Sequence, residues 1–335
     1  MTFSAVIVNY ESGDLLAECV RSLYEQEENV DVIVVDNGSA DGSADTVATL
    51  FPAVTVVRPF RNLGFAGGAN AGAERAEGEL LLFLNPDVRV APGCLGALRK
   101  IFIDPDVGVG APCVHQGVSG QVDYGATLDL LGHPVSLPRP AAPLFVTGCA
   151  LATRKSLFEE LGGFDDRYFM FVEDVDLCWR ALLQGFDIRV ARDAVAFHVG
   201  GAVTPGGYER NGRIESSSFR IGLRERNTLA TMIKCWGGFT LALMVPAYVI
   251  QTLVTAAALR LLGNRKTARE LMAGLLWNGH ELRRTLALRR NVQARRRTAD
   301  VDVFRRLYRG SRKVEVVLRR RLPVIVDEGT AFDER

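Results

Sequence analysis

An apolar run that stops at a carboxylate limits what this chain can fold into more than any other feature. Residues 79–84 read ELLLFL and lead directly into Asn85, Pro86 and Asp87. Such a run is typical of a parallel strand that is covered on both faces. Ligands of open α/β sheets bind just beyond the carboxyl ends of such strands. We therefore expect an α/β fold in which Asp87 faces a pocket.

Strand and helix signals alternate through the first half of the chain, which predicts a parallel sheet with right-handed crossovers. The expected strands cover residues 4–8, 31–35, 54–57 and 80–84, and the expected helices cover 14–26, 43–50, 64–76 and 92–103. The segment 117–143 is rich in Gly and Pro, which predicts a long surface excursion. After it we expect helices at 155–161 and 175–183 and a short strand at 195–197.

The length of 335 residues exceeds the usual size of a single domain. We expect an α/β domain over residues 1–230 and a basic, apolar helical region over residues 231–335. The composition, 48% apolar and 24% charged, is that of a globular protein. Six scattered cysteines without a CxxC pair predict reduced packing thiols rather than a zinc or disulfide framework. No secretory signal opens the sequence, so we expect a cytoplasmic location.

Charge is distributed unevenly along the chain. Residues 260–321 hold 19 Lys and Arg against five Asp and Glu, although the net charge of the chain is only +1. Just before them, residues 237–259 carry no charge over a length that could span a bilayer as a helix. We therefore expect residues 237–262 to lie in or on the inner face of the cell membrane, with the basic segment against anionic lipid. The alternative is a buried helical hairpin in a soluble homodimer.

Polar residues at the ends of two expected elements are candidates for binding a nucleotide. Asp36 ends the second expected strand, and its carboxylate either caps the turn that follows or accepts hydrogen bonds from a nucleobase or ribose. The Gly-rich stretch 64–72 either permits close helix packing or, with Asn62 and Asn70, lets a ligand approach the backbone. No GxGxxG motif is present, so an ordinary dinucleotide site is disfavoured.

Other side chains are candidates for metal binding and proton transfer. Asp87 either binds a metal or closes a turn begun by Asn85, and His198 is either a metal ligand or a satisfied interior histidine. Glu173 and Asp174 follow an apolar, aromatic segment, so burial is expected to raise the pKa of at least one of them toward that of a general base. The alternative is that both are only helix N-terminal acids. Solvent or turn positions are expected for Asp165, Asp166 and Asp176.

Five motifs in order resemble the family 2 glycosyltransferases of the GT-A fold, particularly the bacterial rhamnosyltransferase-like members. The resemblance covers roughly residues 3–230. Its elements are VIVNY at 6–10, VVDNGSADGS at 34–43, RNLGFAGGANAG at 61–72, NPD at 85–87, and GGFD through EDVDLC over 162–178.

The resemblance implies a donor site for a nucleoside-diphosphate sugar, linked to dTDP or UDP. It implies that Asp36 holds the nucleobase or ribose, and that Tyr10, Arg61, Asn62 and Asn85 lie in the same nucleotide-binding site.

The resemblance also implies a metal site and a general base. Asp87 corresponds to the last acid of the metal-binding DxD motif, whose first acid is replaced by Asn85, and His198 corresponds to a histidine that completes the site for Mn²⁺ or Mg²⁺. Asp174 corresponds to the general base, and Gly148 and Glu173 to residues that line the sugar and acceptor.

We therefore expect an inverting, metal-dependent transfer of rhamnose or a similar sugar to a glycan or polyprenyl-diphosphate-linked acceptor in cell-envelope polysaccharide synthesis. A sugar-phosphate nucleotidyltransferase is one alternative, but it usually carries a Gly-rich basic loop after the first strand, which residues 9–13 do not offer. A non-catalytic glycan- or membrane-binding subunit is the other. Nucleic-acid binding is not expected, because few aromatic residues are interleaved with the basic ones.

Overall fold

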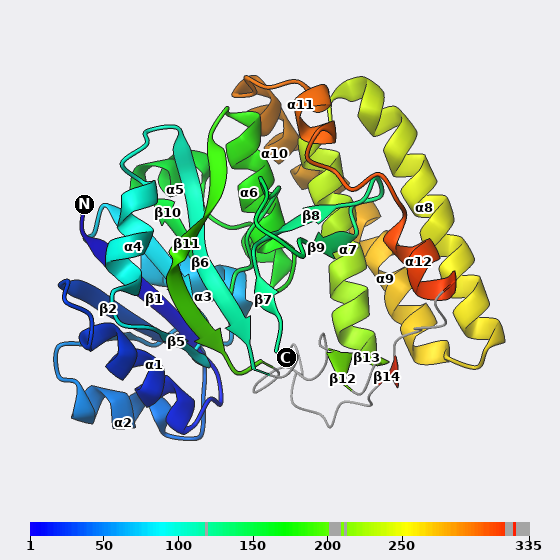
Figure 1. Ribbon diagram of the computed structural model, residues 1–335. Coiled ribbons are helices and arrows are strands. Elements are labelled where there is room, and N and C mark those ends of the chain that lie inside the picture. Colours follow the sequence, from blue (N-terminus) through cyan, green and yellow to red (C-terminus); the bar gives the residue numbers. More distant parts are fainter. Residues whose placement is uncertain (118–119, 201–208, 211–212, 319–323, 326–335) are drawn as a thin grey trace.

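A mixed nine-stranded sheet organises the first two-thirds of the chain (Figure 1). The computed structural model describes residues 1–117, 120–200, 209–210, 213–318 and 324–325. The sheet consists of β1 (Phe3–Asn9), β2 (Val30–Asp36), β3 (Thr55–Val57), β4 (Leu80–Leu84), β5 (Val88–Val90), β6 (Val107–Gln116), β7 (Val122–Asp123), β10 (Ala150–Arg154) and β11 (Asp187–His198). Short strands outside it are β8 (Ala126–Leu128), β9 (Pro134–Ser136), β12 (Glu209–Arg210), β13 (Arg213–Ser216) and β14 (Val324–Ile325).

Helices flank the sheet and form the C-terminal third. The helices that follow strands of the sheet are α1 (Asp14–Tyr24), α2 (Ser43–Leu50), α3 (Gly64–Ala73), α4 (Cys94–Ile101), α5 (Lys155–Leu161), the 3₁₀ helix η1 (Asp166–Tyr168) and α6 (Glu173–Leu183). The C-terminal helices are α7 (Ser218–Cys235), α8 (Gly238–Leu261), α9 (Arg265–His280), α10 (Leu282–Ala294), α11 (Asp300–Phe304) and α12 (Arg312–Leu318). The domain division expected between residues 230 and 231 falls inside α7 and stays a prediction.

The strand order is β3-β2-β1-β4-β10-β6-β11-β5, and only part of it is parallel as expected. Strands β3, β2, β1 and β4 are parallel, and so are β6 and β11, whereas β10 runs antiparallel to both β4 and β6. The reason is the connection before β10. Parallel neighbours need a crossover that carries the chain back to the opposite edge of the sheet. No helix lies between β6 and β10 in the described residues, so β10 starts at the edge where β6 ends.

Side chains alternate between two cores, one on each face of the sheet. Along β1, Phe3, Ala5 and Ile7 pack with α1, α2 and α4, whereas Val6 and Val8 pack with α3, α5, α6 and α7. This is the two-residue period of a strand. All five residues of β4 are buried, which confirms the prediction of a strand covered on both faces.

The expectation of a surface excursion over residues 117–143 is wrong for its central part. Residues 126–129 are buried between the sheet and the C-terminal helices. The Thr127 hydroxyl donates to the Arg306 carbonyl, the Tyr308 amide donates to the Leu128 carbonyl at 2.9 Å, and the Arg312 amide donates to Asp129 Oδ2 at 2.9 Å. These partners lie about 180 positions further along the chain, so the local Gly and Pro content could not reveal them.

Helix α8 lies on the outer edge of the molecule, at the right of Figure 1, and its faces are unusual. Its fully buried side chains are Thr240, Tyr248, Thr252 and Ala256. Its exposed side chains include Phe239, Leu243, Ile250, Val254 and Leu261, and Leu261 is 88% exposed. Among the described residues it is also the one helix long and apolar enough to cross a membrane. On α8, the large aliphatic side chains are therefore exposed on the outer face, whereas the buried side chains on the inner face are two threonines, a tyrosine and an alanine.

All six cysteines are free and buried, which confirms the prediction of packing thiols. Burial raises the pKa of the Cys94 and Cys149 thiols to about 12. They therefore remain protonated at neutral pH.

Candidate active site

Parallel pairing brings the predicted nucleotide-side residues to one edge of the sheet. Asn9 is paired with Asp36 in register, and Ile7 with Leu84, so Tyr10, Asp36 and Asn85 all stand where neighbouring strands end.

Two side chains at this edge are used partly to build turns. Asp36 Oδ1 accepts hydrogen bonds from the Ser39 amide at 3.2 Å and from Asn9 Nδ2 at 3.4 Å, and Arg58 Nε lies 3.6 Å from Asp36 Oδ2. Asn62 Oδ1 accepts from the Gly64 amide at 2.8 Å and so shapes the start of α3. Arg61 is exposed.

Asp87 and His198 form a direct pair beside this edge. His198 Nε2 lies 3.2 Å from Asp87 Oδ1, because antiparallel pairing sets His198 opposite Val88. The other ring nitrogen, Nδ1, is 2.9 Å from Gln116 Oε1, and the Gly200 amide donates to Asp87 Oδ2 at 3.2 Å. A carboxylate oxygen and an imidazole nitrogen whose ring is oriented by a second partner are a donor set that suits a divalent cation. No group of three or more His, Cys, Asp or Glu side chains that could hold a metal ion occurs in the described part of the chain, so the pair is a partial ligand set.

Asp123 is a further carboxylate near this pair that the sequence analysis missed. It lies on β7, where its Oδ2 accepts from the Thr147 hydroxyl at 3.1 Å and its Oδ1 from the Gly125 amide at 2.7 Å. Burial raises the pKa of Asp123, and the hydrogen bonds from the Gly125 amide and the Thr147 hydroxyl oppose this rise.

Asp174 lies in the first turn of α6, on the other side of Gly148. The Gly148 amide donates to Asp174 Oδ2 at 2.8 Å, and the Val175 amide donates to Oδ1 at 2.7 Å. Burial raises the pKa of Asp174, and these two amides and the charge of Arg224 oppose the rise. The Cys149 thiol, whose pKa is raised first by burial, also feels the negative charges of Asp123, Asp87 and Asp174. The Asn85 amide, two residues before Asp87, donates to the Cys149 carbonyl at 3.0 Å, so the segment 148–149 contacts both Asp174 and the end of β4.

Glu173 is the more deeply buried acid of the pair. It is 5% exposed, and its Oε2 atom has no hydrogen-bond partner among the described residues. Burial first, and then the charge of Asp174, raise the pKa of Glu173 well above its ordinary value. The apolar segment before these acids predicted such a shift. A buried carboxyl group with a raised pKa and an open oxygen is typical of a functional site.

The segment that carries these acids has a strained backbone. Phe169, Phe171 and Val172 have φ values of +63°, +68° and +72°. A positive φ is a true outlier for a β-branched valine and persists only where the surroundings enforce it.

Two long-range contacts enforce this conformation. Asn227 of α7, which is 0% exposed, donates through Nδ2 to the carbonyls of Tyr168 at 3.0 Å, Met170 at 3.0 Å and Phe171 at 2.8 Å. From the other side, the Ala66 amide donates to the Phe169 carbonyl at 3.1 Å. Gly64 is required here, since a Cβ atom at that position would lie 2.2 Å from the Phe169 oxygen.

A buried network of ion pairs joins residues on either side of the same segment. Lys234 Nζ lies 2.7 Å from both Asp165 Oδ2 and Asp176 Oδ1, Arg167 pairs with Asp165 at 2.6 Å, and Arg180 pairs with Asp176 at 2.8 Å. The solvent positions expected for Asp165 and Asp176 are therefore wrong, because Lys234 of α7 reaches both carboxylates. The turn position expected for Asp165 is confirmed, since its side chain accepts from the Arg167 amide at the start of η1. Asp166 is exposed as expected.

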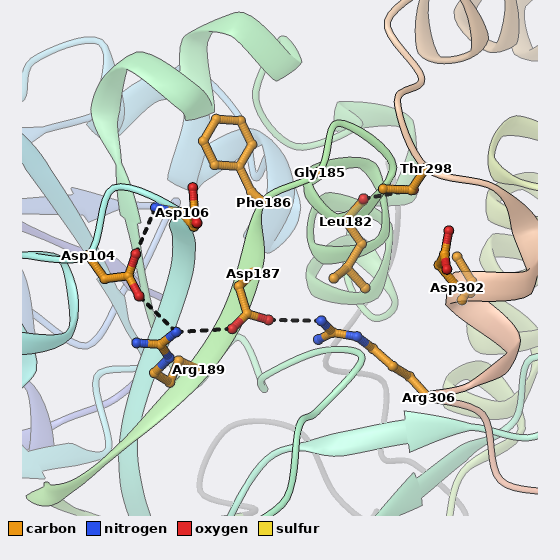
Figure 2. Close-up of a pocket in the computed structure, with 11 residues that line it drawn as sticks. Asp104, Asp106, Leu182, Gly185, Phe186, Asp187, Arg189, Thr298, Asp302 and Arg306 are labelled. Carbon is orange, nitrogen blue, oxygen red and sulfur yellow. Dashed lines mark hydrogen bonds and ion pairs between the residues drawn. The ribbon is translucent and has the colours of Figure 1, made fainter.

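Figure 2 shows a cavity of about 440 Å³ that lies elsewhere, between the start of β11, the end of α6 and α11. Its walls carry Asp104, Asp187, Arg189 and Arg306, which are linked in a chain of ion pairs at 2.9–3.3 Å. None of the predicted site residues lines it. Its charged residues tie the sheet to the C-terminal region.

The fold is similar to that of solved glycosyltransferases. A structure of GalNAc-T7 with UDP, GalNAc and Mn²⁺ superposes with a TM-score of 0.58 at 17% identity, and the match covers 71% of this chain and 49% of that chain. The mannosyltransferase PcManGT from Pyrobaculum calidifontis gives a TM-score of 0.53 at 20% identity, covering 88% and 85% of the two chains. At such identities the likeness shows a shared GT-A-type fold.

Sequence similarity decides the family. The model of glycosyl transferase family 2 matches residues 4–162. The N-acetylglucosaminyl-diphospho-decaprenol L-rhamnosyltransferase of Mycobacterium tuberculosis is 30% identical over 210 residues, which are 51% of this chain and 67% of that protein. The chain belongs to the family 2 glycosyltransferases. A hexosyltransferase of low-salt glycan biosynthesis from Haloferax volcanii is also similar, at 24% identity over 58% of this chain and 66% of that protein. The predictions of family, fold class and enzyme class are confirmed.

In this family 2 glycosyltransferase, the structure brings two pairs of the predicted residues into contact. Asp87 pairs with His198, and Gly148 binds Asp174. The functional roles of the site residues, including those of Tyr10, Asp36, Arg61, Asn62 and Asn85, stay predictions. The residues that sequence reasoning missed, Asp123, Arg224 and Asn227, lie on elements whose position depends on tertiary packing, and no local pattern marks them.

Proposed function

We propose that this glycosyltransferase moves rhamnose or a similar sugar from a dTDP- or UDP-linked donor to a hydroxyl of a polyprenyl-diphosphate-linked glycan, with inversion, in cell-envelope polysaccharide synthesis. The Mycobacterium tuberculosis relative supports the sugar and the lipid-linked acceptor by its name. The similar structures of GalNAc-T7 and PcManGT hold UDP or GDP-Man together with Mn²⁺, which supports a nucleotide sugar and a divalent cation.

On the donor side, Asp36 would accept a hydrogen bond from the nucleobase or ribose, beside Tyr10, Arg61, Asn62 and Asn85. Asp87 and His198 would hold Mn²⁺ or Mg²⁺, with phosphate oxygens and water completing the ligand set. A cation bound there supplies positive charge opposite the leaving diphosphate. His198 keeps its orientation for this role through Gln116, at 2.9 Å.

On the acceptor side, Asp174 would take the proton of the acceptor hydroxyl, whose oxygen forms a bond to the anomeric carbon. The bond between that carbon and the diphosphate oxygen breaks, and the nucleoside diphosphate leaves with the electron pair. One direct displacement inverts the configuration. The raised pKa of Asp174 makes its carboxylate a better base, and Gly148 holds one of its oxygens at 2.8 Å.

One observation carries this proposal: the Gly148 amide binds Asp174, and the next residue, Cys149, accepts a hydrogen bond at 3.0 Å from the Asn85 amide, two residues before Asp87 and its partner His198. The test is Asp174→Asn, assayed with a panel of dTDP- and UDP-sugars and a prenyl-diphosphate-linked N-acetylglucosamine acceptor. Since general-base help contributes about 10² to 10⁴ in rate, we expect transfer to fall by at least ~10²-fold while nucleotide still raises the melting temperature. Asp166→Asn is the matched control, because that carboxylate is exposed. Normal transfer by Asp174→Asn would reject Asp174 as the base.

We further propose that the outer face of α8 contacts the inner surface of the cell membrane. The exposed apolar side chains of α8 are followed by four exposed basic residues near the α8–α9 turn: Arg260, Arg265, Lys266 and Arg269. Each basic residue near an anionic surface contributes about 1 kcal/mol. Other basic residues are used internally instead, since Arg289 donates to the Ile233 carbonyl and Arg306 pairs with Asp187, both within 2.9 Å.

Sedimentation with phosphatidylglycerol-containing vesicles tests the membrane contact. We expect binding that weakens at high salt and falls further in Ile250→Lys, which places a charge on the outer face of α8. Ile103→Lys is the control, because Ile103 lies on the α/β part of the molecule and is 74% exposed, against 61% for Ile250. Protein that stays in the supernatant at both salt concentrations, and sediments as a dimer by ultracentrifugation, would favour the homodimer instead.

A further inference from the structure

Helix α8 directs large apolar side chains outward and hydroxyl groups inward, which is the reverse of an ordinary surface helix. Phe239, Leu243, Ile250, Val254 and Leu261 are exposed and follow one another at steps of four and seven residues, which places them on one face. Only 17% of the apolar 18-residue window of α8 is buried, so α8 is not a core helix. A continuous apolar face of this kind marks a surface that binds a partner or a membrane.

Contacts on the inner face hold α8 to the rest of the protein at its start, in its middle and near its end. The Gly237 amide donates to Asp300 Oδ2 of α11 at 3.0 Å. The Tyr248 hydroxyl donates to Glu225 Oε2 of α7 at 2.7 Å. Near its end, α8 packs against α9 in a small apolar cluster, which includes Ala256, Ala268 and Leu271. Helix α8 is therefore fixed to the C-terminal region along its whole length.

The same contacts argue against a helix that crosses the bilayer. The 24 residues of α8 give a length of about 36 Å, which exceeds the ~30 Å of a hydrocarbon core, so length alone would allow it to span. Spanning would, however, separate Tyr248 from Glu225. It would also separate Gln251 Oε1 from His133 Nε2, which lies 2.8 Å away. If α7 entered the membrane with α8 instead, it would carry the charges of Glu225 and Lys234 into hydrocarbon.

We propose that α8 lies parallel to the membrane surface and inserts its outer face into one leaflet, without spanning the bilayer. The inference rests on the membrane contact in the proposed function and adds its orientation. Helices of this type bury their apolar face about 5–10 Å deep, at the boundary between head groups and acyl chains. Arg260, Arg265 and Lys266, which are exposed at the C-terminal end of α8, then reach the anionic head groups of that same leaflet.

Depth measurements along α8 test this orientation. The variants Phe239→Trp, Ile250→Trp and Leu261→Trp of the full chain are bound to phosphatidylglycerol-containing vesicles that carry lipids brominated at defined acyl positions. Ile250 is eleven residues from each of the other two positions, about 16 Å along the helix axis. We expect the three depths obtained from bromine quenching to agree within about 3 Å, all of them in the outer half of one leaflet.

The unsubstituted chain provides the baseline for its three native tryptophans, two of which, Trp179 and Trp236, are fully buried. Ile103→Trp is the matched control, since Ile103 is 74% exposed on the α/β part of the molecule. It should show no bromine quenching above the baseline. All four substituted positions are exposed, so the melting temperatures of the variants should stay at the value of the unsubstituted chain.

The outcomes separate this inference from the proposed function. If Ile250→Trp lies about 16 Å deeper than Phe239→Trp and Leu261→Trp, the membrane contact stands and the in-plane orientation is overturned, because α8 then spans the bilayer. Quenching of Leu261→Trp alone would also overturn it, since only the basic end of α8 would then meet the lipid. If no α8 position is quenched and the chain stays in the supernatant as a dimer, the membrane contact itself is wrong, and the in-plane orientation falls with it. The sugar-transfer chemistry is tested independently by Asp174→Asn.

Discussion

The proposed donor side and the proposed acceptor side of the site are built in different ways. On the donor side, Asp36, Asp87 and His198 stand at or just beyond strand ends, and the register of neighbouring strands brings them together. On the acceptor side, Asp174 follows a backbone segment with three positive φ values, which Asn227 holds from α7 more than 50 residues later. The sheet alone can position the donor residues, whereas the proposed base depends on the packing of α7.

The strongest test of this difference is Lys234→Met, which removes the cation that Asp165 and Asp176 share next to the proposed base. Asp165 and Asp176 then lose their shared partner in a buried site, so we expect the free energy of unfolding in urea to fall by about 3–5 kcal/mol. Burial by itself would raise the pKa of Asp165. The charge of Lys234 and the charge and hydrogen bond of Arg167 outweigh burial, so the pKa lies below its ordinary value. Its contribution is therefore present at neutral pH and is lost as the pH falls through its folded-state pKa, so the two proteins should converge in acid.

Arg284→Gln is the control for Lys234→Met, because Arg284 forms an exposed pair with Asp166 at 3.6 Å. Its cost should stay below about 1 kcal/mol. Equal destabilisation by the two substitutions would show that the acceptor side does not depend on the buried network.

On the proposed donor side, we expect Asp87→Asn to reduce the rate of transfer by about 10²-fold or more, which corresponds to about 3 kcal/mol in activation free energy. The expected cause is weaker metal binding and not a lower stability of the fold. The pair with His198 is the reason, since only these two proposed ligands lie together. Transfer rates across a Mn²⁺ titration, with urea unfolding in parallel, measure the two effects. An unchanged Mn²⁺ dependence would remove Asp87 from the metal site.

Asn227→Ala removes the contacts that hold the segment with positive φ values before Asp174. Its amide serves three carbonyls, so we expect a loss of about 1–3 kcal/mol in stability. The kcat for transfer should fall by roughly 10-fold while the donor KM stays constant, because only the proposed base is displaced. Asn278→Ala, which removes a buried amide that bonds the Arg226 and Gly274 carbonyls, is the matched control. The same kcat in the two variants would mean that Asn227 has only a structural role.

Glu173→Gln gives the smallest expected effect. Burial and Asp174 raise the pKa of Glu173 in the folded protein, so the unfolded chain loses that proton first as pH rises. Stability should therefore fall by about 1.4 kcal/mol per pH unit between the ordinary and the folded-state pKa, and Glu173→Gln should remove this slope. Urea unfolding as a function of pH measures it. A slope that persists in the variant would assign it to another group.

Sequence patterns set Asp36, Asp87 and His198 correctly at or just beyond strand ends, because the signals for these positions are local. The apolar strand before Asp87, the turn after Asp36 and the apolar residues 195–197 before His198 each lie within ten residues of the side chain that they position, although the strand expected at 195–197 is the end of the longer β11. The antiparallel β10, the buried part of residues 117–143 and the pairing of Lys234 with Asp165 and Asp176 could not be predicted in this way. These partners are distant in sequence, and single-segment patterns carry no information about such pairs.

The burial of all six cysteines allows a single new cysteine to be labelled selectively. Thiol reagents attack the thiolate, and these thiols are shielded and have raised pKa values where a shift is described, for example about 12 for Cys94 and Cys149. Native thiols should therefore stay silent toward maleimides while the chain is folded. A cysteine introduced at Ile250 would then be the one reactive position, and a polarity-sensitive dye attached there would report on the surroundings of α8 without removal of any native residue elsewhere.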